Sequence, residues 1–523
     1  MSLLDGGPAL APRTPTLAGV LTQTARRHGQ QKIVHLHENG PQTALTYAQL
    51  LDRAQRVLAG LRRTLNQPGD ILLLDIPDPA ELICAYWACI LGGFVPLPVP
   101  AAAGLLEQVW ELHGHPRIIT GTGRIIPSGL TPYSAGTFGY LAGHRPSTIH
   151  HQGAPGDLAL LLLTSGSTGV PKAVRLTHAN ILARITATTH VNHLDHRQRT
   201  FNWMPLTHIG GLVMFHTRDV YLGAHQVHAP QQRILNDPLC WLGACHTHRI
   251  TCTWAPNYAF ALVNAAAADL PVDGWDLSRL TYIMNGGEPL HAEVIDRFMA
   301  LLAPHGLPAG AMYPGWGMSE TSSGVTDMPY LTDKVRGRYV PVGRPQPGTR
   351  MRITDEDHTV VPEGETGLVQ VTGATVTSGY QGHDSANKAA FTPDGWFITG
   401  DLGHIQDGIL TVTGRSDDQI TLAGTAYHGH EIEAAVETLG FITPTCTVAT
   451  EVSTAQGERL AVFCQPRTGT LTEADTDAVR TLLSERFAIT GALVLAVGKS
   501  DVPKSGSGKL RRLPLRERFE ESP

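Results

Sequence analysis

A nine-residue stretch rich in hydroxyl groups and glycine, Thr164-Ser-Gly-Ser-Thr-Gly-Val-Pro-Lys172, has the composition of a phosphate-binding loop. Its two glycines allow a tight turn that can direct several backbone N–H groups into one concavity, where the hydroxyl groups add donors and Lys172 adds positive charge. The stretch differs from the nucleotide loop G-x-x-x-x-G-K-[ST], because no glycine precedes Gly169 by five residues and the lysine follows Pro171. We therefore expect a loop that holds phosphate oxygens through hydroxyl groups, backbone N–H groups and one lysine.

The elements on either side of this loop predict how it is positioned. An apolar run over 158–163 precedes it and is typical of a strand buried on both faces, and a helix is predicted over 177–189 after it. A flexible Ser/Gly linker is the less favoured interpretation, because linkers seldom lie between a buried strand and a helix. Other apolar runs alternate with helical spacing, at 70–75, 249–254 and 280–284 for strands and at 17–28, 47–61 and 79–91 for helices. This alternation favours an α/β fold with a mainly parallel sheet covered by helices.

The length and composition indicate a globular protein of more than one domain. The chain has 523 residues, 42% hydrophobic and 16% charged, and 40 basic residues face 46 acidic ones. A net charge of −6 without a long basic block argues against nucleic acid as a partner. Seven scattered cysteines do not form a disulfide framework, and we expect neither a secretory signal nor a membrane span. These features together predict a cytoplasmic location.

The sequence pattern changes after about residue 339, where shorter predicted strands separated by turns rich in Gly, Pro and Asp begin. A strand is predicted over 460–464, and Thr472-Glu-Ala-Asp475 resembles a capping box that opens a helix reaching about residue 487. We predict a large amino-terminal region over 1–414 and a small α+β carboxy-terminal domain over 415–523.

Four further motifs follow the loop in order: Trp316-Gly-Met-Ser-Glu320-Thr, Gly395-Trp-Phe-Ile-Thr-Gly-Asp401, Gly414-Arg-Ser-Asp417-Asp and Pro503-Lys-Ser-Gly-Ser-Gly-Lys509. With the loop, they make the whole chain resemble the adenylate-forming superfamily of acyl-CoA synthetases, fatty acyl-AMP ligases, peptide-synthetase adenylation domains and luciferases. The resemblance implies an AMP-forming ligase that uses ATP and Mg²⁺ to activate an acid. It also implies a large multi-subdomain region with a distorted β-barrel-like part, followed by a small mobile domain.

The resemblance assigns expected roles to residues that could surround the α-phosphorus of ATP, where negative charge builds up. Trp316 occupies the position that stacks on adenine, Asp401 would accept from the ribose hydroxyls with Arg415 nearby, and Glu320 would help to hold Mg²⁺. The full expected nucleotide-binding set is Thr164, Ser165, Gly166, Ser167, Thr168, Gly169, Lys172, Asn285, Gly286, Gly287, Trp316, Gly317, Ser319, Asp401 and Arg415. Taken one at a time, these residues would have ordinary structural interpretations, and their ordered spacing supports the functional one.

Lys509 is the residue most expected to be catalytic. It lies in a Gly/Ser loop of the small domain, so domain closure can carry its ammonium group to the acid oxygen and the α-phosphate. Asp417 matches the position of the hinge between adenylation and transfer, and the adjacent Asp418 leaves an ambiguity of one residue.

The acid is expected to lack an α-amino group. Peptide-synthetase domains for α-amino acids place an aspartate in a pocket helix, whereas the comparable stretch here, Met204-Pro-Leu-Thr-His208-Ile-Gly-Gly, has no carboxylate. His208 is expected to line or gate the acid site, with a structural histidine as the alternative. Bulky Trp254, Tyr258 and Met214 could shorten the pocket.

Three classes of acceptor for the activated group are compatible with the sequence. The favoured one is the phosphopantetheine thiol of a carrier protein, arriving from another chain because no fused carrier domain is visible. Thr421, where many CoA-using relatives have lysine, and Ala173, where glycine is usual, weaken the acyl-CoA ligase alternative. A third possibility is adenylation of a small oxyacid such as nitrite, captured by an amine. An inactive nucleotide-binding regulator is disfavoured, because Lys509, Glu320 and Asp401 are all present.

Overall fold

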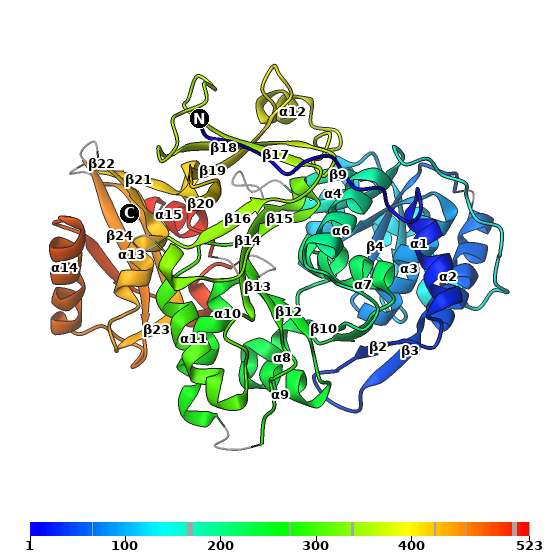
Figure 1. The fold of residues 1–523 in the computed structure, drawn as a ribbon, viewed down its shortest axis with the longest axis horizontal. Coiled ribbons are helices and arrows are strands. Elements are labelled where there is room, and N and C mark those ends of the chain that lie inside the picture. The colour runs from blue at the N-terminus through cyan, green and yellow to red at the C-terminus, as the bar shows by residue number, and fades with distance from the viewer. Residues whose placement is uncertain are drawn as a thin grey trace.

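The computed structural model of the chain describes residues 1–64, 66–164, 171–270, 274–335, 339–422, 425–454, 457–504 and 510–521 (Figure 1). Among these residues, the largest sheet has 14 strands in the order β1-β17-β18-β19-β20-β16-β15-β14-β13-β12-β10-β11-β2-β3. Its members are β1 (Leu3–Asp5), β2 (Lys32–His35), β3 (Thr43–Thr46), β10 (Arg199–Asn202), β11 (His225–His228), β12 (Cys252–Ala255), β13 (Tyr282–Gly286), β14 (Met312–Met318), β15 (Ser323–Asp327), β16 (Pro341–Pro345), β17 (Thr349–Thr354), β18 (Gly367–Gly373), β19 (Phe397–Gln406) and β20 (Ile409–Arg415).

This sheet has a parallel half and an antiparallel half. Strands β2, β11, β10, β12, β13 and β14 run parallel, so their carboxyl ends share one edge. From β14 through β15, β16, β20, β19 and β18 to β17 every pairing is antiparallel. The antiparallel half begins at β15, before residue 339, and the short strands joined by turns after residue 339 extend it.

Two smaller sheets complete the amino-terminal part. One has the order β5-β4-β6-β7, and the other is the hairpin β8-β9. Their bounds are β4 (Ile71–Asp75), β5 (Val95–Pro98), β6 (Arg117–Thr120), β7 (Ser134–Thr137), β8 (Leu158–Thr164) and β9 (Lys172–Thr177). The helices of residues 1–414 are α1 (Leu17–Arg27), α2 (Tyr47–Leu61), α3 (Pro79–Gly92), α4 (Leu105–Leu112), α5 (Phe138–Ala142), α6 (His178–Val191), α7 (Arg218–Leu222), α8 (Gln231–Asn236), α9 (Leu239–Thr247), α10 (Asn257–Ala265), α11 (Ala292–Leu302) and α12 (Asp384–Ala390).

The carboxy-terminal elements gather at the end of the molecule opposite α1, α2 and α3 (Figure 1). They are β21 (Gln419–Leu422), β22 (Thr425–His428), α13 (Gly429–Val436), β23 (Ile442–Thr454), β24 (Gly457–Pro466), α14 (Glu473–Phe487), β25 (Leu493–Ala496) and α15 (Leu513–Glu520). Two hydrophobic clusters within residues 420–519 are built only from residues of this segment. Thr472 caps α14 with the expected capping box, in which its hydroxyl accepts from the Asp475 N–H.

The expected α/β architecture is confirmed, with several bounds close to those predicted. Helix α2 occupies residues 47–61 as expected, and its Thr46 and Gln49 form a capping box at its start.

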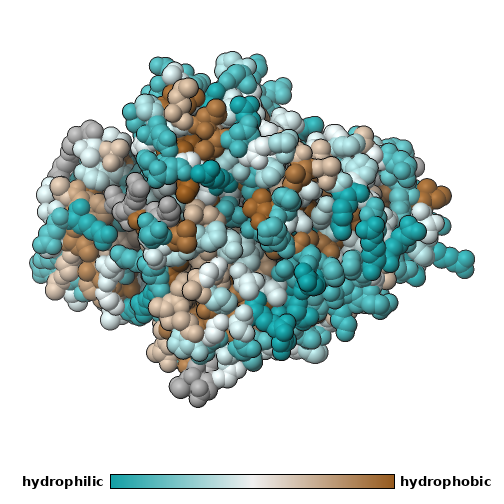
Figure 2. Space-filling view, in the orientation of Figure 1, coloured by the Kyte–Doolittle hydropathy of each residue, from teal (hydrophilic) through white to brown (hydrophobic). Residues whose placement is uncertain are grey.

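Much of the visible face is covered by hydrophilic side chains, with apolar residues in separate patches (Figure 2). In the part of the chain that the structure describes, no helix combines the length and apolar character needed to cross a bilayer.

Candidate active site

A large cavity opens where the parallel strand ends, the hairpin β8-β9 and the carboxy-terminal elements meet. Its volume is about 1450 Å³, and its wall includes Lys172, His208, Glu320, Arg415 and Asp417. Residues that are hundreds of positions apart in sequence therefore share one space. Of the residues assigned to the site from sequence, Ser165, Gly166, Ser167, Thr168, Gly169 and Lys509 lie outside the described residues.

The phosphate-loop motif lies at the tip of a hairpin. Thr164 ends β8, Lys172 begins β9, and the two are directly paired across the antiparallel strands. The helix predicted over 177–189 corresponds to α6 (His178–Val191), but the sequence analysis did not predict β9, which lies between the loop and this helix. Ala173, Val174 and Leu176 of β9 are buried, the first in one hydrophobic cluster and the other two in another, so the strand packs between the two clusters. Lys172 is consequently fixed by a strand at its backbone while its side chain lines the cavity.

Tyr380 links Lys172 to Glu320. The Lys172 ammonium lies 5.3 Å from the centroid of the Tyr380 ring, and the Tyr380 hydroxyl donates to Glu320 Oε1 at 2.9 Å. Burial raises the pKa of Glu320, while the Tyr380 hydrogen bond and the nearby Arg415 oppose the shift. A cation beside this carboxylate would favour its ionised form. Sequence reasoning missed Tyr380, because no motif or spacing connects it with either partner.

A second polar group joins β14, β19 and β20. The Trp316 indole N–H donates to Asp401 Oδ2 at 2.8 Å, and Arg415 Nη1 lies 3.4 Å from Asp401 Oδ1. Arg415 also binds Asp417 through Nε at 2.8 Å. Burial lowers the pKa of Arg415, but the hydrogen bond that it donates to Asp417 and the charges of Asp401 and Asp417 outweigh this effect, so the net shift is upward. Trp316, Asp401 and Arg415 are thus brought together as the motifs suggested, and the stacking of Trp316 on adenine stays a prediction.

The stretch Asn285-Gly286-Gly287 lies at the end of β13. Gly286 and Gly287 line the cavity, and a Cβ on Gly286 would come within 2.3 Å of the Gly315 carbonyl oxygen on β14. Glycine at this position therefore permits the close approach of the two strands. Asn285 is fully buried, and its side-chain N–H donates to Asn257 at 3.3 Å instead of facing the cavity wall.

Gly317 and Ser319 continue the wall beyond Trp316, and both line the cavity. A Cβ on Gly317 would lie 2.2 Å from the Ser323 carbonyl oxygen, so this glycine also reflects close packing between β14 and β15. Of the expected nucleotide-binding residues that the structure describes, Asn285, Trp316 and Asp401 do not line the cavity, whereas the others do, namely Thr164, Lys172, Gly286, Gly287, Gly317, Ser319 and Arg415.

His208 and Trp254 form the wall between this group and the end of β12. Their rings are stacked with centroids 6.3 Å apart and planes inclined by 10°. Gly210 makes room for the indole, because a Cβ there would lie 2.3 Å from Trp254. The Gly210 N–H donates to His208 Nδ1 at 3.1 Å, so the neutral imidazole carries its proton on Nε2. His208 can therefore offer an N–H donor to a ligand oxygen.

The two adjacent aspartates after β20 have different partners. Asp417 binds Arg415 of the large sheet, whereas Asp418 lies 2.9 Å from Arg512, which also binds Glu433 at 2.7 Å. This pattern separates the two candidates for the hinge position: Asp417 is tied to the nucleotide motifs and Asp418 to the carboxy-terminal elements. Residues on either side of the Lys509 loop, namely Lys504, Leu510 and Arg511, line the cavity.

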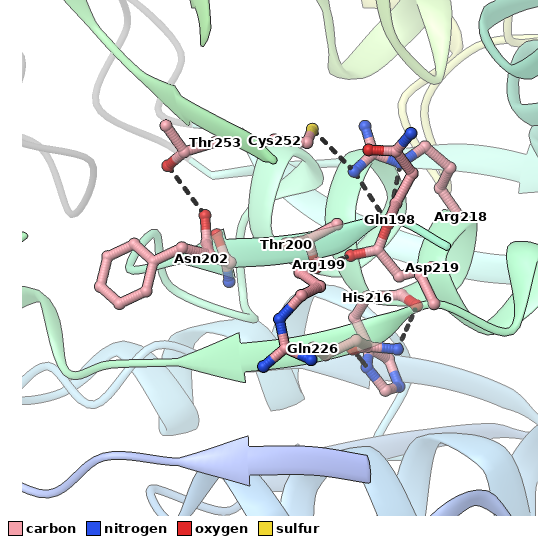
Figure 3. Close-up of polar contacts among 12 residues, drawn as sticks. Gln198, Arg199, Thr200, Asn202, His216, Arg218, Asp219, Gln226, Cys252 and Thr253 are labelled. Carbon is pink, nitrogen blue, oxygen red and sulfur yellow. Dashed lines mark hydrogen bonds and ion pairs between the residues drawn. The ribbon is translucent and has the colours of Figure 1, made fainter. Parts of the chain in front are cut away.

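A buried polar network lies beneath the wall, and no sequence motif predicted it. Arg218 and Asp219, whose side chains are 3% and 1% exposed, form an ion pair at 2.8 Å, and Thr200 donates to Asp219 at 2.5 Å. Figure 3 shows Arg218 reaching Cys252 as well, at 3.6 Å. The network supports β10, which leads directly into the stretch that carries His208.

The arrangement suits a polyanionic ligand that also carries hydroxyl groups. Lys172 and Arg415 supply positive charge, while Asp401 and Glu320 supply carboxylate acceptors within the same region. The buried carboxylate of Glu320 would be a suitable ligand for Mg²⁺. In sites of this kind Mg²⁺ is commonly held by one or two carboxylates together with substrate phosphates.

Comparisons with known proteins agree with this chemistry. A family of AMP-binding enzymes matches residues 126–381. Aspulvinone E synthetase melA from Aspergillus terreus is 30% identical over 97% of this chain and 58% of its own length. The solved structure of McyG A-PCP complexed with phenylalanyl-adenylate has a TM-score of 0.91 at 32% identity, covering 99% of this chain and 97% of that one. The adenylation domain of a keto acid-selecting NRPS module, bound to keto acyl adenylate, has a TM-score of 0.77 at 31% identity, covering 95% of this chain and all of that one.

The present chain spans somewhat more than half the length of the curated relatives that it matches. Its likeness in fold to the solved A-PCP structure nevertheless extends over nearly the whole chain. The protein therefore belongs to the adenylate-forming family of AMP-binding enzymes, and is an AMP-forming ligase that uses ATP to activate an acid.

Proposed function

We propose that this protein adenylates a carboxylic acid without an α-amino group, in the first instance a 2-oxo acid, and transfers the acyl group to a carrier-protein phosphopantetheine thiol. One observation carries the choice of acid. Among residues 203–210 and 214, which line the cavity and which we assign to the acid, there is no carboxylate to pair with an ammonium group, and Gly210 is packed against Trp254. A substrate ammonium group would be desolvated there without a charged partner, which is unfavourable.

The stacked His208 and Trp254 supply what a 2-oxo acid needs. The Nε2–H of neutral His208 can donate to a carboxylate or keto oxygen, and the flat Trp254 ring offers apolar contact. The keto acyl adenylate in the related domain of 31% identity supports the same substrate class. The relatives named as nonribosomal peptide synthetases, and the relative described as an A-PCP structure, support a carrier protein as the acceptor.

In the first step, a carboxylate oxygen of the acid bonds to the α-phosphorus as the bond to the bridging oxygen breaks, and pyrophosphate leaves with the electron pair. Lys172 holds the outer phosphates, Asp401 and Arg415 hold the ribose, and Lys509 neutralises charge at the α-phosphate. Glu320 would hold Mg²⁺, which supplies further neutralisation of the phosphate oxygens when bound.

In the second step, the thiol sulfur bonds to the acyl carbon, the bond to the AMP oxygen breaks, and the thiol proton passes to solvent base. We propose that residues 415–523 turn about Asp417 between the two steps. The separate hydrophobic clusters of the carboxy-terminal segment support this movement, because the segment has a core of its own.

The test is acid-dependent exchange of pyrophosphate into ATP, with 2-oxo acids compared with the α-amino acids that carry the same side chains. We expect exchange with a 2-oxo acid and at least about tenfold less with its amino counterpart, because the ammonium group lacks a partner. Preferential exchange with the amino acid would refute the assignment of the acid. A carrier protein and CoA are then offered separately to the adenylate, and discharge to CoA alone would refute the assignment of the acceptor.

The Lys509→Ala variant tests the catalytic assignment in the same assay. We expect a loss of exchange of about a hundredfold or more, since Lys509 supplies positive charge only at the reacting phosphate. Lys499→Ala is the matched control, because Lys499 is an exposed lysine of the same segment that does not line the cavity. Equal activity in the two variants would remove Lys509 from the mechanism.

A further inference from the structure

Three polar residues form a row at the far end of the cavity from the nucleotide motifs. Asn202, His228 and His35 are the last residues of the neighbouring parallel strands β10, β11 and β2, and all three line the cavity. The strand register places Asn202 opposite His228 and His228 opposite His35. Directly opposed residues on adjacent strands point to the same face of a sheet, so the row presents one polar surface.

The hydrogen bonds of Asn202 and His228 are used within the protein. The Asn202 amide N–H lies 3.2 Å from His228 Nδ1, and His228 Nε2 lies 2.9 Å from the Gln226 amide oxygen. Because an amide oxygen only accepts, His228 carries its proton on Nε2 and accepts from Asn202 at Nδ1. The same Gln226 oxygen accepts from His216 Nδ1 at 2.9 Å, a contact visible in Figure 3. His228 is therefore held neutral, with both ring nitrogens occupied.

His35 is the exception in the row. Its side chain stacks on His228 with ring centroids 5.4 Å apart, and the residue is only 2% exposed. Neither of its ring nitrogens has a hydrogen-bond partner among the described residues. Burial lowers the pKa of His35 to about 4, so the ring is neutral near pH 7 and has one donor and one acceptor. Buried polar atoms in native proteins are rarely left without partners, so this ring is well suited to meet a ligand.

We infer that this end of the cavity is a subsite for an uncharged hydroxyl group on the distal part of the acid substrate, with His35 as its hydrogen-bond partner. A hydroxyl matches the ring, because it can either donate to the unprotonated nitrogen or accept from the ring N–H. A charged group does not match: the row itself is neutral, and the nearby Asp75 is already paired with Arg124 at 2.5 Å. The inference rests on the proposed function, because it describes the acid of that reaction.

The sheet also sets the reach of this acid. The row ends at β2. In the sheet, β2 is two strands away from β10, which leads into the stretch that carries His208, and four strands away from β13, which carries Gly286. Neighbouring strands lie about 4.8 Å apart, so the hydroxyl should lie roughly 10–19 Å from the activated carboxyl group. Short acids with a hydroxyl near the carboxyl group would not reach His35.

The experiment measures kcat/KM for pyrophosphate exchange with pairs of 2-oxo acids that differ only in a terminal hydroxyl, over a series of increasing length with alkyl and aryl spacers. In the unaltered protein we expect the hydroxylated acid of suitable length to be preferred about tenfold, the magnitude of one hydrogen bond in a buried site. In His35→Phe, which retains a ring to stack on His228, the preference should fall to about one. His35→Gln, which retains a donor and an acceptor, should recover part of it.

His225→Phe is the matched control. His225 lies at the other end of β11, is also buried with an unpaired Nε2 among the described residues, and does not line the cavity. This variant should retain the hydroxyl preference of the unaltered protein.

The outcomes separate the two levels of the proposal. Exchange with 2-oxo acids but no hydroxyl preference at any length, or a preference that survives in His35→Phe, overturns the subsite and leaves the proposed function intact. Absence of exchange with every 2-oxo acid, while amino acids exchange, overturns the proposed function and the subsite together.

Discussion

The buried ion pair between Arg218 and Asp219 offers a sharp test of how the cavity floor is held. In Asp219→Asn the Arg218 guanidinium would remain buried, with the distant Cys252 sulfur at 3.6 Å and the Phe215 ring at 4.6 Å as weak partners. Removing one member of a buried pair commonly costs about 3–5 kcal/mol, because the remaining charge has lost its compensation. We expect the variant to lose that amount of unfolding free energy.

Two further variants make the reasoning refutable. Arg218→Met combined with Asp219→Leu removes both charges, and should recover most of the loss because no unpaired ion remains. Asp195→Asn breaks the pair between Asp195 and Arg197, whose side chain is 81% exposed, and should cost less than about 1 kcal/mol.

Urea unfolding followed by tryptophan fluorescence is the assay, because all eight tryptophans lie before residue 415 and report on the large region. A cost for Asp219→Asn no larger than that for Asp195→Asn would refute the argument. So would a double variant that is less stable than the single one.

Three other predictions concern the two hinge candidates and one buried histidine. Asp417→Asn removes one partner of Arg415 and should raise the KM for ATP about two- to fivefold, as measured by pyrophosphate exchange. An unchanged KM would show that Arg415 does not need Asp417 in order to bind the nucleotide. Asp418→Asn should leave the KM for ATP unchanged and should instead speed amide hydrogen exchange in β23 and β24, because Arg512 loses a partner within the carboxy-terminal elements. A raised KM for ATP with unchanged hydrogen exchange would reverse the assignments of Asp417 and Asp418. Burial lowers the pKa of His216 to about 3 in the folded protein, whereas its pKa in the unfolded chain is near 6.5. Between these two pH values the unfolded chain binds a proton that the folded protein does not. The free energy of unfolding therefore falls as the pH decreases from about 6.5 to 3. His216→Gln should reduce that slope by about 1.4 kcal/mol per pH unit in urea titrations, and an unaltered slope would contradict the neutral state of this ring.

Sequence reasoning anticipated those parts of the fold whose causes are local. The helical spacing of residues 47–61 and the capping box at Thr472 were both sufficient to define helices. Strand β9 was missed, because its stability comes from pairing with β8 and from packing against residues far away in sequence. A local pattern of six residues does not record such partners.

The same distinction applies to the site. Motif order identified Glu320, Asp401 and Arg415; Glu320 and Arg415 line one cavity, and Asp401 is paired with Arg415. It did not identify Tyr380, which reaches Glu320 across 60 positions, or His35, which is a single histidine at the end of a strand. The importance of these two residues depends on what surrounds them in space, and no spacing in the chain expresses that.

The packing of the hairpin β8-β9 restricts how its sequence can vary in length. Leu160 and Leu162 of β8 belong to the main hydrophobic cluster, whereas Leu161 between them belongs to a second cluster with Ala173 of β9. One inserted residue within β8 would exchange the side chains offered to the two clusters and would shift Thr164 away from Lys172. Insertions in related chains should therefore be absent from the strands of this hairpin, since the position of the lysine is tied to the register that both clusters enforce.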